Sequence, residues 1–176
     1  MVRMFVYRVG VDPRGRVLLI LADEDVTRLL PMVIGQYEAR AIAMGLAKEY
    51  FPRPLTHDLL HSVISSLGHR LERIEVTKLE NEVFYAELNL VGDEDIVKVD
   101  SRPSDAIALA VRADAPIYVS EDVLDQAGVL PEALHIEGEE EERVDDEESG
   151  PELAPEDMPK IRRLLEDLDI DDDSEQ

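Results

Sequence analysis

The segment Arg102-Pro-Ser-Asp-Ala-Ile-Ala-Leu-Ala110 decides how this chain folds. It has the features of a helix start followed by an apolar helix, because proline is favoured at the first helical position and aspartate complements the positive end of the helix dipole. The segment Pro52-Arg-Pro-Leu-Thr-His-Asp58 has the same design. Each segment predicts a helix N-terminus where an arginine, a hydroxyl and a carboxylate meet free backbone N–H groups.

Working outward from these segments, hydrophobic periodicity predicts an α+β domain. Alternation indicates strands over residues 4–11, 16–22, 29–34, 70–79, 82–91, 96–100 and 117–119. Helical spacing indicates helices over residues 36–49, 56–67, 103–113 and 120–128. Because the strands are grouped and do not strictly alternate with helices, we expect a mixed, largely antiparallel sheet packed with about four helices.

Two of these helices have informative side chains. The helix over residues 56–67 is expected to use Thr56 as its N-cap and to bury an apolar stripe made of Leu59, Leu60, Val63, Ile64 and Leu67. The helix over residues 36–49 carries the small residues Ala39, Ala41, Ala43, Gly45 and Ala47. These small residues predict a close approach to a sheet or to a second subunit.

The charge of the chain divides it into two regions. Residues 137–176 hold 19 acidic and 4 basic residues, a net charge of −15, which leaves −8 of the total −23 for residues 1–136. We therefore predict one domain over residues 1–136 and a largely disordered acidic tail over residues 137–176, with a short amphipathic helix at 158–168. The acidic balance argues against broad, nonspecific binding of nucleic acid, so any recognition of phosphate must be local.

Composition also limits the chemistry and the location. The chain has no cysteine, which excludes disulfides, thiolate metal sites and cysteine nucleophiles. The longest purely apolar run, residues 17–22, is too short to cross a bilayer. We expect a cytoplasmic protein with no membrane association.

Four segments in order resemble one known family. They are Ile34-Gly-Gln-Tyr-Glu-Ala39, the two Arg-Pro segments quoted above, and Ala115-Pro-Ile-Tyr-Val119. Together they are similar to the bifunctional nuclease domain family, also known as a domain of unknown function, over roughly residues 2–130. The resemblance implies an α+β fold around a mixed sheet, a homodimer or larger homo-oligomer, and hydrolysis of both DNA and RNA.

Three carboxylates are candidates for a metal site. Glu38, Asp58 and Asp105 each lie in one of the family-like segments and near a predicted helix start. If these helix starts converge, the carboxylates suit Mg²⁺ or Mn²⁺, which prefer oxygen ligands and could activate water for phosphodiester hydrolysis. The structural alternative is equally strong, because an acidic residue at a helix N-terminus is stabilised by the helix dipole alone.

Other side chains near these carboxylates complete the candidate site. His57 is the candidate base, and Arg53 and Arg102 are candidates to bind phosphate oxygens. Thr56 and Ser104 are either substrate-binding hydroxyls or ordinary first-turn hydrogen-bonding groups.

The string His57-Asp-Leu-Leu-His61 resembles a zinc-binding helix, because histidines at positions i and i+4 share a face. Zinc is disfavoured, since aspartate replaces the usual glutamate and the sequence does not indicate a third ligand.

Two classes of function therefore remain. The first is a metal-assisted nuclease acting on DNA and RNA through His57, Asp58, Asp105 and Glu38. The second is a noncatalytic, homo-oligomeric regulatory domain that binds a small anionic ligand or a protein partner with the same residues. The acidic balance favours the second class, whereas the family resemblance favours the first, which we place ahead.

Overall fold

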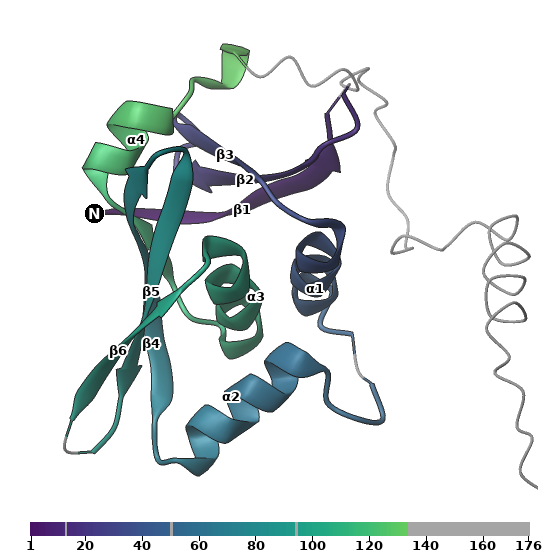
Figure 1. Ribbon diagram of the computed structural model, residues 1–176, viewed down its shortest axis with the longest axis vertical. Coiled ribbons are helices and arrows are strands. Elements are labelled where there is room, and N and C mark those ends of the chain that lie inside the picture. Colours follow the sequence, from purple (N-terminus) through teal and green to yellow (C-terminus); the bar gives the residue numbers. More distant parts are fainter. Residues whose placement is uncertain (13, 50, 94, 134–176) are drawn as a thin grey trace, which may run out of the picture. The chain divides into compact units, whose positions relative to one another are not determined.

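The computed structural model describes residues 1–12, 14–49, 51–93 and 95–133. These residues form a mixed seven-stranded sheet with four α-helices, which confirms the predicted α+β class (Figure 1). The strands are β1 (Val2–Val11), β2 (Val17–Asp23), β3 (Leu29–Val33), β4 (Arg70–Glu80), β5 (Val83–Val91), β6 (Ile96–Ser101) and β7 (Ile117–Val119). The helices are α1 (Gln36–Leu46), α2 (Thr56–Ser66), α3 (Pro103–Ala113) and α4 (Glu121–Ala127). The predicted acidic tail and its helix at 158–168 lie outside the described residues.

The sheet is built from two antiparallel halves that β7 joins. The strand order is β3-β2-β1-β7-β4-β5-β6, and every neighbouring pair is antiparallel except β7 with β4. The sheet is therefore largely antiparallel, as the grouped strands predicted. Only the short β7, reached through α3, gives it a mixed character.

Helix α3 is the centre of the core. Figure 1 shows it beside the sheet, between the β1–β3 half and the β4–β6 half. Its residues 106–110 are completely buried, in one apolar cluster with residues from both halves of the sheet, among them Leu21 and Ile74. An apolar helix that packs against both halves can hold its N-terminal turn in a constant position, and this turn carries Arg102 and Asp105.

The small residues of α1 allow close packing against α3. A Cβ atom at Gly45 would lie 2.6 Å from Val111 Cγ2 and 2.7 Å from Arg112 Nη1. The close approach at Gly45 is therefore to α3, a helix of the same chain that the prediction of a sheet or a second subunit did not include. The sequence pattern could not distinguish these partners, because a small-residue face fits any of them.

Two expectations for α2 are wrong. Thr56 is the first helical residue, and Leu55, whose backbone is extended, occupies the N-cap position. Of the five residues in the predicted buried stripe, only Ile64 is buried, while Leu59, Leu60, Val63 and Leu67 are exposed. The apolar spacing correctly predicted a helix, but α2 contacts the domain along a narrower strip than its apolar face provides.

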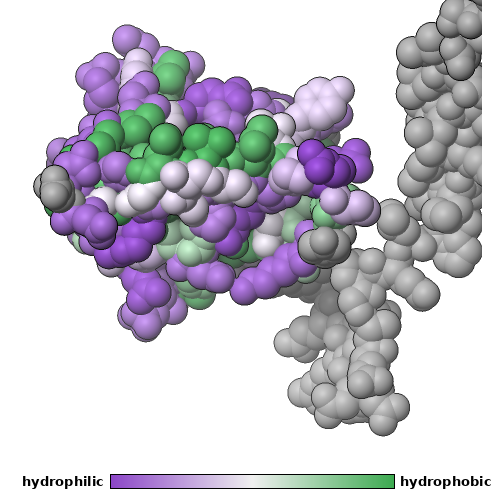
Figure 2. Space-filling model, turned by 90° about the horizontal axis from the view of Figure 1, so that it is seen from below, coloured by the Kyte–Doolittle hydropathy of each residue, from purple (hydrophilic) through white to green (hydrophobic). Residues whose placement is uncertain are grey.

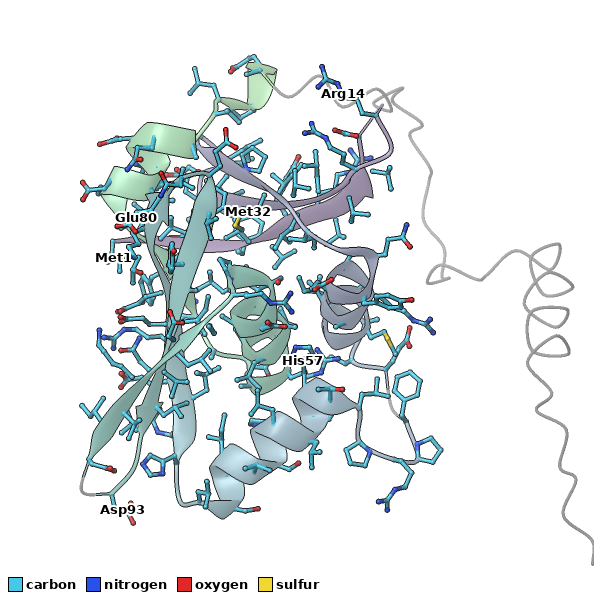
Figure 3. All side chains as sticks on the ribbon, viewed as in Figure 1. Met1, Arg14, Met32, His57, Glu80 and Asp93 are labelled. Carbon is cyan, nitrogen blue, oxygen red and sulfur yellow. The ribbon has the colours of Figure 1, made fainter. Side chains whose placement is uncertain are left out.

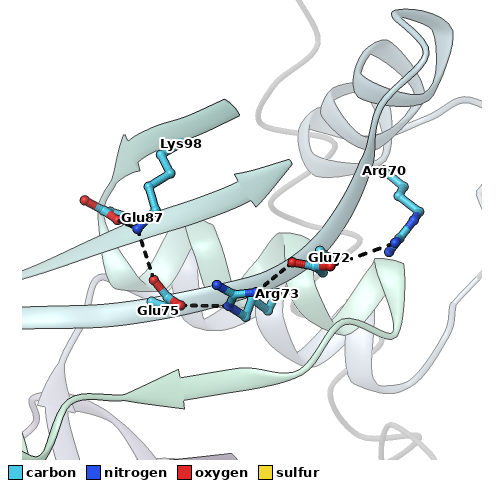
Figure 4. A network of polar contacts seen from close by, with 6 residues as sticks. All are labelled: Arg70, Glu72, Arg73, Glu75, Glu87 and Lys98. Carbon is cyan, nitrogen blue, oxygen red and sulfur yellow. Dashed lines mark hydrogen bonds and ion pairs between the residues drawn. The ribbon is translucent and has the colours of Figure 1, made fainter. Parts of the chain in front are cut away.

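Charged side chains on β4, β5 and β6 neutralise one another (Figure 4). On β4 the charged residues stand between core residues such as Ile74 and Val76. Their side chains therefore lie on the sheet face opposite α3. Glu75 forms ion pairs with Arg73 at 2.7 Å and with Lys98 at 3.5 Å. Arg73 also forms an ion pair with Glu72 at 2.6 Å. Because these cations are paired with carboxylates, this face is not a positively charged surface for nucleic acid.

Within the parts of the chain that the structure describes, no helix is both long enough and apolar enough to span a membrane.

Candidate functional site

Arg102 joins two helices through its guanidinium. Its Nη1 atom donates to Glu38 Oε1 at 2.8 Å, and Glu38 lies in the first turn of α1. Its Nε and Nη2 atoms donate to the two carboxylate oxygens of Asp105 at 2.6 and 3.1 Å, and Asp105 lies in the first turn of α3. The Arg102 side chain nevertheless remains 65% exposed, so part of this cation faces solvent.

His57 extends this arrangement to a third helix. It is the second residue of α2, and its Nε2 atom lies 3.5 Å from Asp105 Oδ1. Figure 3 shows His57 at the N-terminal end of α2, on the side that faces α3. The imidazole is largely buried, whereas Asp105 is about one-third exposed. Glu38, His57, Arg102 and Asp105 therefore form one continuous array, which we call the polar cluster.

The charges within the polar cluster determine its protonation. Burial by itself would raise the pKa of Asp105, but the hydrogen bonds and charge of Arg102, with a smaller contribution from His57, hold that pKa below its usual range. Asp105 and Glu38 in turn raise the pKa of the Arg102 guanidinium. At neutral pH, Asp105 is therefore a carboxylate and Arg102 a cation.

A pocket of about 300 Å³ borders the polar cluster. Glu38, Arg102 and Ser104 are among its polar lining residues. The rest of the lining comes from the end of β3 with the following Ile34 and Gly35, from the turn residue Glu82 and the start of β5 at Val83 and Phe84, and from Pro103 of α3. Ser104 is thus placed where a bound molecule could reach it, although its side chain is mostly buried.

Two other predicted binding residues lie apart from this pocket. Arg53 is exposed in the loop before α2, and none of the ion pairs of the polar cluster includes it. Thr56 is exposed in the first turn of α2, next to His57 in sequence. Their roles in substrate binding remain predictions.

Asp58 faces a different part of the molecule. Its Oδ1 atom accepts a hydrogen bond from Arg112 Nε at 2.6 Å, and its Oδ2 atom accepts one from the Leu55 backbone N–H at 2.9 Å. Burial raises the pKa of Asp58, but these hydrogen bonds and the Arg112 charge outweigh that effect and lower it. Asp58 and Arg112 line a second pocket of about 330 Å³, together with His61.

Comparison with known proteins gives the family of this domain. The bifunctional nuclease domain matches residues 19–132, which is more than half of the chain. The chain belongs to the bifunctional nuclease domain family. This confirms the resemblance carried by the two Arg-Pro segments, both of which lie inside the matched range.

The relatives of this bifunctional nuclease domain fall into two groups. An uncharacterized protein of Mycobacterium tuberculosis is 39% identical over 161 residues, which cover 92% of this chain and 90% of the relative. Bifunctional nuclease 2 and Bifunctional nuclease 1 of Arabidopsis thaliana are 33% and 31% identical over 106 residues, which cover 58% of this chain. The matched region spans only 32% and 33% of these two plant proteins.

The donor geometry of the bifunctional nuclease domain does not fit the predicted three-carboxylate metal site. Glu38 and Asp105 are both bound to Arg102, whereas Asp58 is bound to Arg112 and the Leu55 N–H group. Among residues 1–133 without the masked positions 13, 50 and 94, no group of three or more His, Asp and Glu side chains is arranged to hold a metal ion. Carboxylate oxygens of all three residues are already held by a guanidinium group, Arg102 for Glu38 and Asp105 and Arg112 for Asp58.

Two important residues of the bifunctional nuclease domain were not identified from the sequence. Arg112 donates to Asp58 and also to the carbonyls of Ala41 and Ala108, at 2.8 and 2.7 Å, so one side chain connects α1, α2 and α3. Gly35 lies directly under the Glu38 carboxylate, where a Cβ atom would collide with Oε2. No sequence motif surrounds Arg112. The glycine three residues before Glu38, in contrast, could have indicated that a side chain packs closely against the backbone there.

Proposed function

We propose that this domain hydrolyses phosphodiester bonds of DNA and RNA at the polar cluster. The observation that carries the proposal is the contact of His57 with Asp105, which is bound to Arg102, an exposed cation that lines a pocket. The printed names of the plant relatives, which are called bifunctional nucleases, support the same reaction.

Each member of the polar cluster has a defined chemical role in this proposal. Asp105 orients the His57 imidazole through Nε2, which leaves Nδ1 to accept a proton from an attacking water. Arg102 binds a nonbridging phosphate oxygen and stabilises the negative charge that develops on it. Glu38 holds the Arg102 guanidinium at the pocket until substrate arrives.

The two carboxylates limit how strongly the polar cluster attracts phosphate. Arg102 already forms ion pairs with Glu38 and Asp105, so a phosphate must compete with them for the guanidinium. We therefore expect weak binding of substrate and a strong dependence on this one arginine. This expectation agrees with the net charge of −8 that residues 1–136 carry.

Metal assistance by Mg²⁺ or Mn²⁺ stays a prediction from the sequence. Because the three carboxylates are held by Arg102 and Arg112, we assign no step of the proposed hydrolysis to a metal ion.

The proposal is tested by comparing His57→Ala and Arg102→Gln with the wild-type protein on labelled single-stranded DNA and RNA. Each assay is run with Mg²⁺, with Mn²⁺ and with EDTA. We expect each variant to lower the cleavage rate by about a hundredfold or more, since general base catalysis contributes on that order. Inhibition by EDTA would in addition show that the wild-type reaction needs a metal.

The matched control is Arg16→Gln. Arg16 is also an exposed arginine whose Nε atom pairs with an aspartate, Asp12, at 2.8 Å, but it lies in the β1–β2 hairpin. This variant should cleave at the wild-type rate. Equal rates for wild type, His57→Ala and Arg102→Gln would contradict the proposal and indicate a different site or a contaminating nuclease.

The second candidate is a noncatalytic domain that binds a small anion at Arg102. The observation that favours it is the size of the adjoining pocket, about 300 Å³, which suits a small molecule. Calorimetry with inorganic phosphate and with mononucleotides distinguishes the two. Binding that Arg102→Gln abolishes, in a preparation that cleaves neither DNA nor RNA, would establish this second function instead.

A further inference from the structure

The pocket that Glu38, Arg102 and Ser104 line also has apolar lining residues, and we call it the Arg102 pocket. Val33 and Val83 line it with side chains that are 58% and 52% exposed, so a bound molecule can cover them. The other apolar lining residues are Met32, Ile34, Phe84 and Pro103. A phosphate alone would use Arg102 and leave this apolar surface in contact with water. The lining therefore suits a molecule that joins an anionic group to a larger apolar or aromatic group.

The apolar lining of the Arg102 pocket is separate from the apolar surface of α2. Figure 2 shows a band of apolar side chains on the face seen from below, which is the α2 side of the domain in Figure 1. The pocket is lined by β3 and the residues after it, by the β4–β5 turn, by β5 and by the N-terminal ends of α1 and α3. Among the described residues, none of its lining comes from α2. Exposed apolar residues of α2 can therefore serve as controls for the pocket.

Glu82 lines the Arg102 pocket from an unfavourable backbone conformation. Asn81 and Glu82 form the two-residue turn between β4 and β5, and the residues on either side of them, Glu80 and Val83, are paired in the sheet. Their φ angles are positive, 51° and 64°. The second position of such a turn usually holds glycine, because a side chain at positive φ is strained. Strained residues of this kind are concentrated at functional sites, so Glu82 is a candidate ligand-binding residue.

The charge of Glu82 argues against a simple anion as the ligand. The lining residues include two carboxylates, Glu38 and Glu82, and the single guanidinium of Arg102, which already pairs with Glu38. Within the described part of the chain no ion pair includes Glu82, whereas the nearby Glu80 pairs with Lys78 at 3.2 Å. A carboxylate can only accept hydrogen bonds. A ligand that satisfies both Arg102 and Glu82 must therefore carry an anionic group and, apart from it, N–H or O–H donors.

We propose that the Arg102 pocket binds one unpaired guanosine nucleotide of the substrate. The phosphate lies at Arg102, the base lies against the apolar lining, and the Watson–Crick edge of the base donates to Glu82. This inference rests on the proposed function, because it takes Arg102 as the group that binds phosphate.

Guanine is the base that matches Glu82 best. Its N1–H group and its N2 amino group are adjacent donors, which fit the two oxygens of one carboxylate. Adenine and cytosine offer an amino group beside a ring nitrogen that can only accept. The one N–H group of uracil or thymine lies between two carbonyl oxygens, which repel a carboxylate.

This binding mode selects single-stranded nucleic acid. Base pairing occupies the Watson–Crick edge of guanine, and opening a base pair costs free energy. A pocket of about 300 Å³ is at the lower end of small-molecule sites, with room for one nucleotide and not for a base pair. We therefore expect the pocket to take a guanosine that is already unpaired.

The test is calorimetry of the full chain with GMP, UMP and ribose 5-phosphate. The wild-type protein should bind GMP about tenfold more tightly than UMP, the order expected for one bidentate pair. It should bind UMP more tightly than ribose 5-phosphate, since only UMP has a base to stack. Glu82→Gln should remove the preference for GMP. The matched control Glu80→Gln, in the same hairpin but outside the pocket lining, should keep it.

A second pair of variants tests the apolar lining. Val83→Ser should weaken the binding of GMP and UMP by a similar factor and leave ribose 5-phosphate unchanged, because contact with the face of a base does not depend on its edge. The control Val63→Ser makes the same change at a valine of α2 that is 44% exposed, close to the 52% of Val83. It should bind all three molecules like the wild type.

Glu82→Gly separates ligand binding from folding. Glycine adopts a positive φ without strain, so this variant should melt at a higher temperature than the wild type. It should nevertheless lose the preference for GMP. A stabilised protein without base selectivity would show that Glu82 is present for the ligand and not for the turn.

The outcomes separate this proposal from the proposed function. Equal affinities for the three molecules, abolished by Arg102→Gln, would overturn the guanosine site and leave the phosphate site intact. A preference for GMP that survives Glu82→Gln would also overturn it. If none of the three molecules binds, both proposals fail. Selective binding of GMP through Glu82 by a protein that cleaves neither DNA nor RNA would support the guanosine site and contradict only the hydrolysis.

Discussion

The carboxylate of Asp58 acts as a structural connector between helices. It accepts hydrogen bonds from Arg112 and from the Leu55 N–H group, and Arg112 also binds carbonyls of α1 and α3. The helices that Arg112 connects are those that carry Glu38, His57 and Asp105. Asp58 therefore supports the polar cluster from a distance, although its place beside His57 in the sequence suggested direct participation.

We expect Asp58→Asn to lower the free energy of unfolding by about 1–2 kcal/mol at neutral pH, because Arg112 loses its ionic partner. The pKa of Asp58 is lower in the folded protein than in the unfolded chain. Its stabilising contribution is therefore complete above the unfolded value and is lost as the pH falls through the folded value. Urea denaturation at several pH values should show the difference from the wild type shrinking below about pH 4.

The control for this measurement is Asp125→Asn, at an exposed aspartate of α4. It should change the free energy of unfolding by less than about 0.5 kcal/mol. A similar small effect of Asp58→Asn at neutral pH would show that the Asp58–Arg112 pair does not stabilise the helices.

Gly35 determines where the Glu38 carboxylate lies. Its φ of −77° is accessible to any residue, so the absence of a side chain matters here for space and not for backbone conformation. We expect Gly35→Ala to displace Glu38 from Arg102 and to change the cleavage rate by about tenfold or more, because small displacements in a catalytic site are costly. Gly10→Ala is the control, since a Cβ atom there would meet its nearest neighbour, Arg8 Nε, at an ordinary 3.8 Å. Equal activity of both variants and the wild type would show that the position of Glu38 is unimportant.

At the scale of secondary-structure elements, a histidine links the end of α2 to the hairpin of β5 and β6. His69 Nε2 lies 2.9 Å from Asp95 Oδ1, and its Nδ1 lies 3.0 Å from the Leu67 carbonyl. The Leu67 carbonyl and then Asp95 raise the pKa of His69. A protonated imidazole donates to both oxygens, so the link is strongest when His69 is charged.

We expect this link to make the hairpin more stable in mild acid than in mild alkali. Because the pKa of His69 is raised by folding, its contribution is fully present below the unfolded value of about 6.5 and is lost as the pH rises through the folded value. Hydrogen exchange of the β5–β6 amides in the wild type and in Asp95→Asn, at matched pH values on both sides of this range, measures the effect. The exchange rates of these amides should differ between the two proteins at the lower pH and become equal at the higher pH. A difference that is the same at both pH values would contradict a role for the charged imidazole.

At the scale of the whole molecule, charge is the dominant feature. Residues 137–176 contribute −15 of the total charge of −23. A chain that ends at Ile136 should therefore bind single-stranded DNA more tightly than the full chain at low salt, because it repels the phosphates less. The difference should vanish at high salt, where charges are screened over a few ångströms. Fluorescence anisotropy of labelled single-stranded DNA across a salt series measures the affinity of each chain. Equal affinities at low salt would show that the acidic segment does not compete with nucleic acid.

Much of the fold and part of the candidate site could be predicted from the sequence. Local signals were sufficient for the start of α3 at Pro103, for the Ser120 N-cap of α4 and for the antiparallel meander of β4, β5 and β6. The two Arg-Pro segments and the Glu38 segment also carried the family, which the match over residues 19–132 confirms. Proline geometry, capping and apolar alternation act over a few residues, so they can be recognised before any tertiary contact is known.

Only the tertiary structure decided how these residues are partnered. Three carboxylates that looked equivalent in the sequence separate into two that bind Arg102 and one that binds Arg112. The apolar face of α2, which predicted burial, is mostly exposed because α3 and the sheet cover only the side that carries Ile64. The physical reason is that ion pairing and burial depend on distances between residues such as Glu38 and Arg102, which are 64 positions apart in sequence and meet only through packing around α3.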